Sequence, residues 1–171
     1  MLPYNELGAA AAAYNADEKE LCRLDEIYSA VKTPFEIRSG SEKVTRRFFK
    51  ICNNGRESFT GLYKSLTEQG ICKGHQCIAY GLYMRDNGIE LSEGLAVYGY
   101  SICSAIVTNC VKLVPLSQLA GQKILGESFE LISSASEKAL FTDINDIGIS
   151  GAGFDLRAMQ HERLYSRQYM S

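Results

Sequence analysis

The apolar residues of this 171-residue chain recur at helical spacing, and no stretch alternates strictly between apolar and polar residues. Within residues 17–32, for example, Leu21, Leu24 and Tyr28 fall on one helical face. The pattern predicts an all-α fold, a single helical bundle of about seven helices with an extended C-terminal tail. Helices are predicted over residues 4–15, 17–32, 35–52, 56–69, 76–86, 92–113, 116–139 and 155–163, and a loop over 142–154.

The predicted helix over 92–113 contains a run without charge, from Leu95 to Val111. A membrane-spanning helix needs about 20 mostly apolar residues. This run is shorter, includes Tyr, Ser, Thr and Asn, and stops at Lys112, so a central core helix of a soluble bundle fits better. We expect its apolar residues to be largely buried, at the latest in a dimer: Leu95, Ile102, Ala105, Ile106 and Val107.

Composition excludes several classes of protein. Apolar residues make up 46% and charged residues 22%, which is typical of a globular domain and not of a disordered chain. The net charge of −2, with both signs mixed along the chain, argues against a nucleic-acid-binding protein. The start of the chain lacks the features of a signal peptide, so a cytoplasmic location and reduced, buried thiols are expected. The six cysteines are Cys22, Cys52, Cys72, Cys77, Cys103 and Cys110.

The most metal-like cluster is Cys72-Lys-Gly-His75-Gln-Cys77, because thiolates and imidazole are good ligands for Zn²⁺. The spacing matches no common zinc motif, so a helix-start loop with His75 hydrogen-bonded to nearby backbone is the simpler interpretation.

No catalytic set and no P-loop motif is present in the sequence. Acidic pairs such as Asp25/Glu26 are interpreted as solvated helix faces and caps.

The last eleven residues, 161–171, carry two Tyr, two Arg, one His and one Met. Tyr and Arg are enriched at the centres of protein–protein interfaces. Two interpretations follow: a terminal helix docked on its own core, or a tail that inserts into a partner.

Four blocks resemble one family. Residues 159–171, Met-Gln-His-Glu-Arg-Leu-Tyr-Ser-Arg-Gln-Tyr-Met-Ser, are similar to the C-terminal signature of the UreF family of urease accessory proteins. Residues 111–123 are similar to its Pro–Gln–Gly-Gln stretch, and His75 to Gly81, followed by Gly88-Ile-Glu, to a third motif. The fourth block runs from Leu24-Asp25 through Ala30 to Pro34, Glu36 and Arg38. The blocks occur in the family's order and span most of the chain.

The resemblance implies a non-enzymatic protein without a cofactor of its own. It implies a homodimer that binds UreD (UreH in some species), recruits the GTPase UreG, and acts on the urease apoprotein during Ni²⁺ delivery, with neither nucleic acid nor membrane as a partner. Position by position, it assigns partner binding to Arg157, Gln160, His161, Glu162, Tyr165, Ser166, Arg167 and Tyr169.

The resemblance also implies dimer or structural roles for two further groups. His75, Tyr80 and Gly81 fall where the family has residues close to its dimer interface. Pro115, Gln118, Gly121 and Gln122 lie at a helix break; a Pro-capped helix start, with Gly121 allowing close helix approach, is the simpler interpretation, and a partner contact or the wall of a passage is the alternative.

Two departures from the family pattern matter. Thr45 stands where the family usually has Gly, and Met1 falls where the family already has an internal helix. We therefore expect a bundle over 1–141 that lacks the family's first helices and exposes apolar surface, followed by loop, short helix and partner-binding tail over 142–171.

Overall fold

The computed structural model describes residues 1–52, 55, 57–114, 116–149 and 151–165. Within that part of the chain the structure is all helical, with nine α-helices and two short 3₁₀ helices, and no strand. The all-α prediction is confirmed; the helix count is slightly higher than predicted because of the way the chain divides after residue 127. The α-helices are α1 (Glu6–Asn15), α2 (Glu18–Val31), α3 (Phe35–Ile51), α4 (Phe59–Glu68), α5 (Gln76–Asp86), α6 (Leu91–Leu113), α7 (Gln118–Glu127), α8 (Phe129–Ala139) and α9 (Ala152–His161); the 3₁₀ helices are η1 (Leu2–Tyr4) and η2 (Ile144–Asp146).

Local sequence sets most helix boundaries. Asp17 caps α2 through a capping box with Glu20, in which each side chain accepts from the other residue's backbone N–H. Pro34 stands at the N-cap of α3 and separates it from α2. Ser58 and Ser117 cap α4 and α7 by accepting the backbone N–H groups three residues on.

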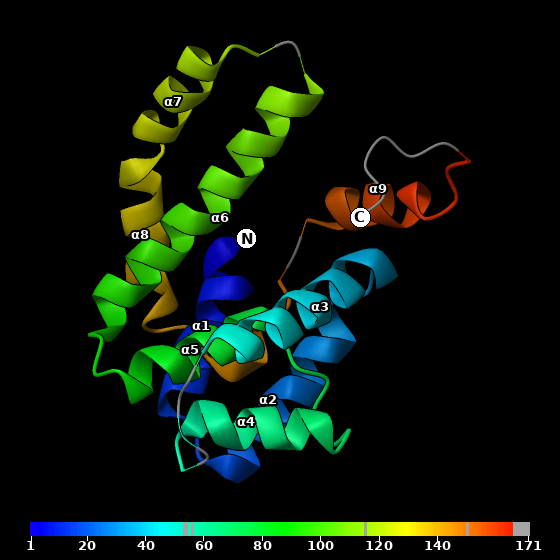
Figure 1. The fold of residues 1–171 in the computed structure, drawn as a ribbon. Helices are drawn as coiled ribbons and strands as arrows, with labels where there is room; N and C mark the ends of the chain where they lie inside the picture. Colours follow the sequence, from blue (N-terminus) through cyan, green and yellow to red (C-terminus); the bar gives the residue numbers. More distant parts are fainter. Residues whose placement is uncertain (53–54, 56, 115, 150, 166–171) are drawn as a thin grey trace.

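The core forms around α1, whose alanines let other helices approach closely. Ala9, Ala10 and Ala13 are fully buried, and α1 packs most extensively against α5. Side chains on α2, α4 and α5 complete this core, including Leu24, Tyr63 and Leu82. Figure 1 shows α1 at the centre of the molecule, with α5 across it and α2, α3 and α4 on one side.

The three helices α6, α7 and α8 form a second layer, which we call the α6–α8 arm. Both α7 and α8 pack along α6, and Figure 1 shows the three extending together away from α3 and α4. Sequence predicted one helix over 116–139, but the chain divides at Ser128, whose Oγ donates to the carbonyl oxygen of Ile124 at 2.8 Å. Such back-bonding weakens the regular helical hydrogen bonds and bends the chain.

Burial along α6 is uneven. Gly94, Leu95, Tyr98 and Gly99 are buried, but the second half of the helix is largely open in the single chain. Of the five residues expected to be buried, Leu95 is buried, Ile102 and Val107 are half-buried, and Ala105 and Ile106 are exposed. The expectation thus holds for Leu95 alone in one copy of the chain. By length and composition α6 is also the one helix in the described ranges that could cross a membrane.

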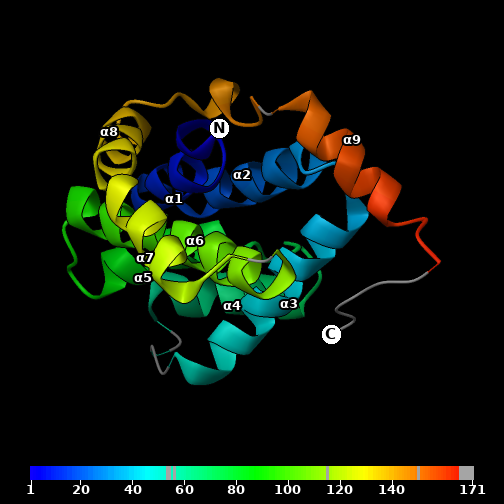
Figure 2. The same cartoon turned by 90° about the horizontal axis from the view of Figure 1, so that it is seen from above.

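The segment before α9 is attached to the bundle. Ile147 is buried in the core, the Gly148 N–H donates to the Tyr4 carbonyl oxygen at 2.8 Å, and the Asn5 amide donates to the Ile149 carbonyl oxygen at 3.1 Å. Helix α9 begins three residues earlier than predicted and lies beyond α3, at the opposite side of the molecule from α8 (Figure 2). The division of the chain at residue 141 stays a prediction.

Candidate functional site

The C-terminal helix α9 is held on α3 by polar contacts. His161 Nδ1 lies 2.6 Å from Glu36 Oε2, and Glu162 Oε1 accepts the Phe35 backbone N–H at 2.8 Å. No residue of α9 is buried. Two blocks singled out in the sequence, one near residue 36 and one at the C-terminus, therefore meet in space. Helix α9 is therefore docked on its own bundle, as in the first of the two interpretations. The contact buries too little apolar surface to fix the helix there firmly.

The other predicted partner-binding residues in the described part of the chain are exposed on α9 or shortly after it. Arg157 Nη1 donates to Gln160 Oε1 at 3.0 Å on the exposed surface, and Tyr165 is fully exposed. Several apolar side chains are exposed beside them: Phe154, Leu156, Met159 and Leu164. A shallow groove of about 440 Å³ separates α9 from the start of α3 and is lined in part by Phe35, Met159 and Arg163. Ser166, Arg167 and Tyr169 lie outside the described residues.

The predicted helix-break residues lie where α7 packs on α6. A Cβ on Gly121 would stand 2.8 Å from Val111 Cγ2 and 3.1 Å from Val107 Cγ1, so a larger residue here would force these valine side chains to shift. Gln118 and Gln122 are exposed beside a shallow hollow of about 370 Å³ between the two helices. Pro115 lies outside the described residues. Gly121 thus allows α7 to pack closely on α6, and the side chains of Gln118 and Gln122 lie at the surface.

His75 lies inside the bundle at the N-cap of α5, fully buried. Its Nε2 is 2.7 Å from Ser29 Oγ, and the edge of its ring packs against Tyr28. The His75 side chain therefore contacts a hydroxyl group on α2. The sequence had predicted a hydrogen bond to nearby backbone instead. Burial lowers the pKa of His75 to about 4, assisted by the positive charges of Lys32 and Arg38 and opposed by Asp25. The imidazole is neutral at physiological pH.

The Ser29–His75 contact has the residue types of a catalytic pair. A working Ser–His pair needs a reachable serine, an imidazole with a pKa near the working pH, and a group that orients the second ring nitrogen. Here His75 Nδ1 has no hydrogen-bond partner among the described residues, and the ring is fully buried with its pKa lowered. The pair is therefore a structural contact between α2 and α5.

Asp25 was misinterpreted from the sequence as a solvated acidic residue. It is 2% exposed, and its carboxylate accepts three hydrogen bonds: from Tyr63 Oη at 2.6 Å, Lys73 N at 2.7 Å and Gly74 N at 3.1 Å. The signal was present, since Asp25 lies four residues after Leu21 and three before Tyr28, on the apolar face of α2. Its neighbour Glu26 is exposed, as predicted.

Tyr80 and Gly81 also pack inside the chain. Tyr80 stacks on Tyr98 with ring centroids 4.5 Å apart, which joins α5 to α6. Gly81 faces Ala10, and a Cβ at this position would overlap the Ala10 carbonyl oxygen. These residues hold α5 against α1 and α6, and their relation to a second copy of the chain stays a prediction.

The metal-binding alternative is not supported by the geometry. Among the described residues, no three His, Cys, Asp or Glu side chains are placed to hold a metal ion. Cys72, His75 and Cys77 turn to different neighbours: Cys72 to Cys22 and His75 to Ser29, while Cys77 interacts with Tyr28. The cysteines are all free; Cys72 and Cys77 are buried as expected, and the other four are half-buried.

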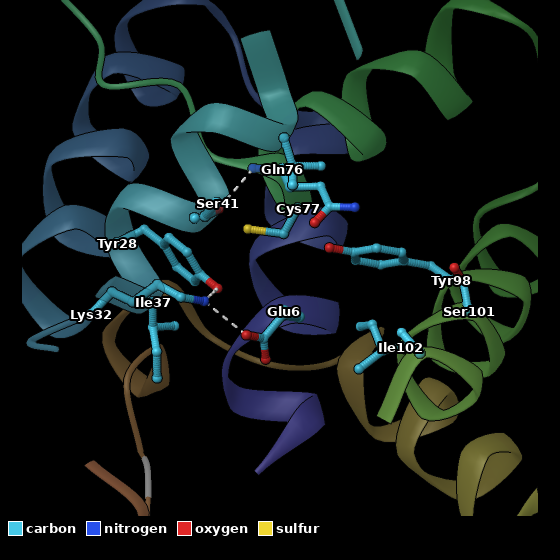
Figure 3. A pocket seen from close by; sticks show the side chains of 13 residues that line it. Glu6, Tyr28, Lys32, Ile37, Ser41, Gln76, Cys77, Tyr98, Ser101 and Ile102 are labelled. Carbon is cyan, nitrogen blue, oxygen red and sulfur yellow. Dashed lines mark hydrogen bonds and ion pairs between the residues drawn. The ribbon is translucent and has the colours of Figure 1, made fainter. Parts of the chain in front are cut away.

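A cleft of about 290 Å³ opens between α1, α2, α3, α5 and α6 (Figure 3). Lys32 Nζ donates to Glu6 Oε1 and to Tyr28 Oη, each at 2.8 Å. Burial raises the pKa of Glu6, but the charge and hydrogen bond of Lys32 outweigh it, and the pKa is lowered overall. Burial raises the pKa of Cys77 to about 12, which keeps this thiol protonated. Lys32, Glu6 and Tyr28 are thus joined by hydrogen bonds inside this cleft. The Cys77 thiol is not activated as a nucleophile.

Comparison with known proteins identifies the family to which the chain belongs. The family model described as UreF matches residues 2–128. A urease accessory protein UreF of Actinobacillus pleuropneumoniae serotype 5b (strain L20) is 32% identical over 98% of this chain and 76% of its own length. Proteins of the same name from Haemophilus influenzae (strain PittGG) and Paenarthrobacter aurescens (strain TC1) are 33% and 31% identical, over 98% and 86% of this chain and 74% and 67% of their own lengths. The chain belongs to the UreF family of urease accessory proteins.

Proposed function

We propose that this chain is a non-enzymatic scaffold that binds UreD (UreH) and the GTPase UreG while Ni²⁺ is delivered to the urease apoprotein. The proposal is supported by family membership together with one observation: α9 exposes every one of its residues at least in part, and Tyr165 beyond it is fully exposed. Nickel is cargo in this proposal, and the chain needs no cofactor of its own.

The contacts of α9 divide its residues into two groups. His161 and Glu162 contact α3 and set the position of the helix. Arg157, Gln160 and Tyr165 are exposed to a partner, and we assign Ser166, Arg167 and Tyr169 to the same partner-binding segment. Tyr offers a large rigid surface with one hydroxyl, and Arg offers five N–H donors, which makes both suited to the centre of an interface.

The hold on α9 is weak enough to be rearranged by a partner. The contact between His161 and Glu36 is solvent-exposed on the His161 side, and even an exposed ion pair contributes only about 0–1 kcal/mol. We therefore propose that residues 142–171 act as the partner-binding part of the chain and residues 1–141 as the bundle that carries it.

The scaffold proposal is tested by capture of UreD and UreG with the full chain. Tyr165→Ala and Arg167→Ala should each weaken the complex about 30-fold if they are interface hot spots. Arg157→Ala should weaken it less. Lys64→Ala removes an exposed cation on α4, away from both α9 and the α6–α8 arm, and serves as the matched control. Wild-type capture of both partners by Tyr165→Ala and Arg167→Ala would contradict the assignment of the tail.

We also propose that the chain pairs with a second copy through the α6–α8 arm. The arm exposes many large apolar side chains: Val97, Tyr100, Ile106, Leu113, Leu119, Ile124, Phe129 and Leu131. Exposed apolar surface on this scale is typical of an interaction site. Gln118 and Gln122 lie on the same arm and would contribute polar contacts at its edge.

A further inference from the structure

Two thiols from distant parts of the sequence meet inside the bundle. Cys22 lies on α2 and Cys72 in the loop between α4 and α5, 50 residues later, and their Sγ atoms are 3.9 Å apart. Both are free thiols. A disulfide needs an S–S distance of about 2.05 Å, and rotation about the Cα–Cβ bonds can move each sulfur by the remaining distance.

The loop that carries Cys72 is fixed on both sides of the cysteine. Before it, the Leu66 carbonyl oxygen accepts the N–H groups of Ile71 and Cys72 at 3.0 and 3.2 Å. After it, Asp25 accepts the N–H groups of Lys73 and Gly74. Asp25 lies about one helical turn after Cys22 on α2. By fixing the backbone next to Cys72, its carboxylate keeps the Cys72 sulfur near the Cys22 sulfur.

The two thiols differ in access to solvent. Cys72 is 2% exposed, and Cys22 is half-buried. Burial, together with the negative charge of Asp25 and the neighbouring Cys22, raises the pKa of Cys72 well above its usual value. A dissolved oxidant can therefore reach Cys22, while Cys72 reacts only with a group brought to it within the protein.

We propose that Cys22 and Cys72 form an oxidisable dithiol, which closes to an intramolecular disulfide on reaction with a low-molecular-weight disulfide such as oxidised glutathione. The Cys22 thiolate attacks one sulfur of oxidised glutathione, which breaks the glutathione S–S bond, forms a mixed disulfide and releases one glutathione thiolate. The Cys72 sulfur then attacks the Cys22 sulfur, which breaks the mixed disulfide; the Cys72 proton passes to the sulfur of the departing glutathione, which leaves as a thiol. The first glutathione thiolate takes up the proton that Cys22 released to solvent, so two glutathione thiols are formed; the two cysteines are oxidised by two electrons and the oxidised glutathione is reduced by two.

Closure of this disulfide would tie α2 to the loop that leads into α5. The bond joins residues 50 apart in sequence, so it restricts the unfolded chain strongly and stabilises the folded one. The inference does not depend on the proposed partner binding.

The disulfide is tested by mapping thiols in the full wild-type chain after treatment with oxidised glutathione. Free thiols are blocked with iodoacetamide and the protein is digested with trypsin. Cleavage after Lys and Arg places Cys22 alone in peptide 20–23 and Cys72 alone in peptide 65–73. We expect these two peptides linked to each other, a link lost on reduction, and a melting temperature about 5 °C higher than that of the reduced protein.

Two variants identify the order of attack. In Cys72→Ser, Cys22 should remain as a mixed disulfide with glutathione; in Cys22→Ser, Cys72 should stay unmodified in the folded protein. Cys103→Ser, which removes another half-buried thiol on α6, should leave the 20–23/65–73 link unchanged. The proposal is overturned if wild-type Cys22 accumulates a stable glutathione adduct, if both cysteines remain free, or if Cys72 links to a different cysteine. The wild-type map decides the matter even where Cys72→Ser fails to fold.

Discussion

Asp25 joins three segments of the interior through one buried carboxylate. Its three hydrogen bonds come from Tyr63 on α4 and from the backbone of Lys73 and Gly74. Asp25→Asn keeps the shape but places an N–H₂ group against one or more of these donors. Leaving buried donors unpaired destabilises a protein by about 1–3 kcal/mol for each, so we expect a loss of about 3 kcal/mol in the free energy of unfolding.

Urea denaturation measures that loss, with Glu26→Gln as control, because Glu26 is the exposed neighbour on the same helix. The control should change stability by less than about 0.5 kcal/mol. Equal effects of the two substitutions would show that the buried hydrogen bonds contribute little.

His75 should make stability depend on pH between about 6.5 and 4. Above pH 6.5 the imidazole is neutral in both states; below it the unfolded chain takes up a proton that the folded chain accepts only near its lowered pKa of about 4. The folded state therefore loses stability as pH falls, by about 1 kcal/mol per pH unit and about 3 kcal/mol in total. His75→Gln should flatten the curve of unfolding free energy against pH in this window. Parallel curves for wild type and variant would refute the buried, neutral histidine.

At the scale of the helices, glycine positions decide how closely pairs can pack. Gly81→Ala would push a methyl group into the Ala10 carbonyl of α1, where backbone cannot yield, and should destabilise the fold by about 3 kcal/mol. Gly126, on α7, has no atom within 4 Å of an added Cβ, so Gly126→Ala should stabilise by up to about 1 kcal/mol through helix propensity. Thermal melts of both variants check the signs; a stable Gly81→Ala protein would mean that α1 and α5 do not pack as closely as described.

At the scale of the whole molecule, the exposed arm predicts self-association. Wild type should run as a dimer in size-exclusion chromatography with light scattering, and the double variant Ile106→Asp/Leu119→Asp should run as a monomer, because both side chains are open on the arm. Ile51→Asp, equally exposed at the end of α3, should remain dimeric. A monomeric wild type at tens of micromolar, roughly the range where exposed apolar surface associates, would contradict the dimer proposal, as would a dimeric double variant.

The sequence alone determined the helical class, most helix boundaries and the family. These depend on local information: a period near 3.6, an Asp or Ser at an N-cap, Pro34 between two helices, and motifs of a few residues. The break between α7 and α8 at Ser128 was not predicted, because the helical spacing of apolar residues continues through Ser128.

Only the tertiary structure decided which residues meet. It placed Asp25 in the interior, Cys22 against Cys72, His75 against Ser29, and His161 against Glu36, 125 residues away. It also left the second half of α6 open in a single chain, although its composition is that of a core helix. The physical reason is that periodicity shows which face of a helix is apolar, whereas the partner of that face is set by long-range packing, which no local pattern encodes.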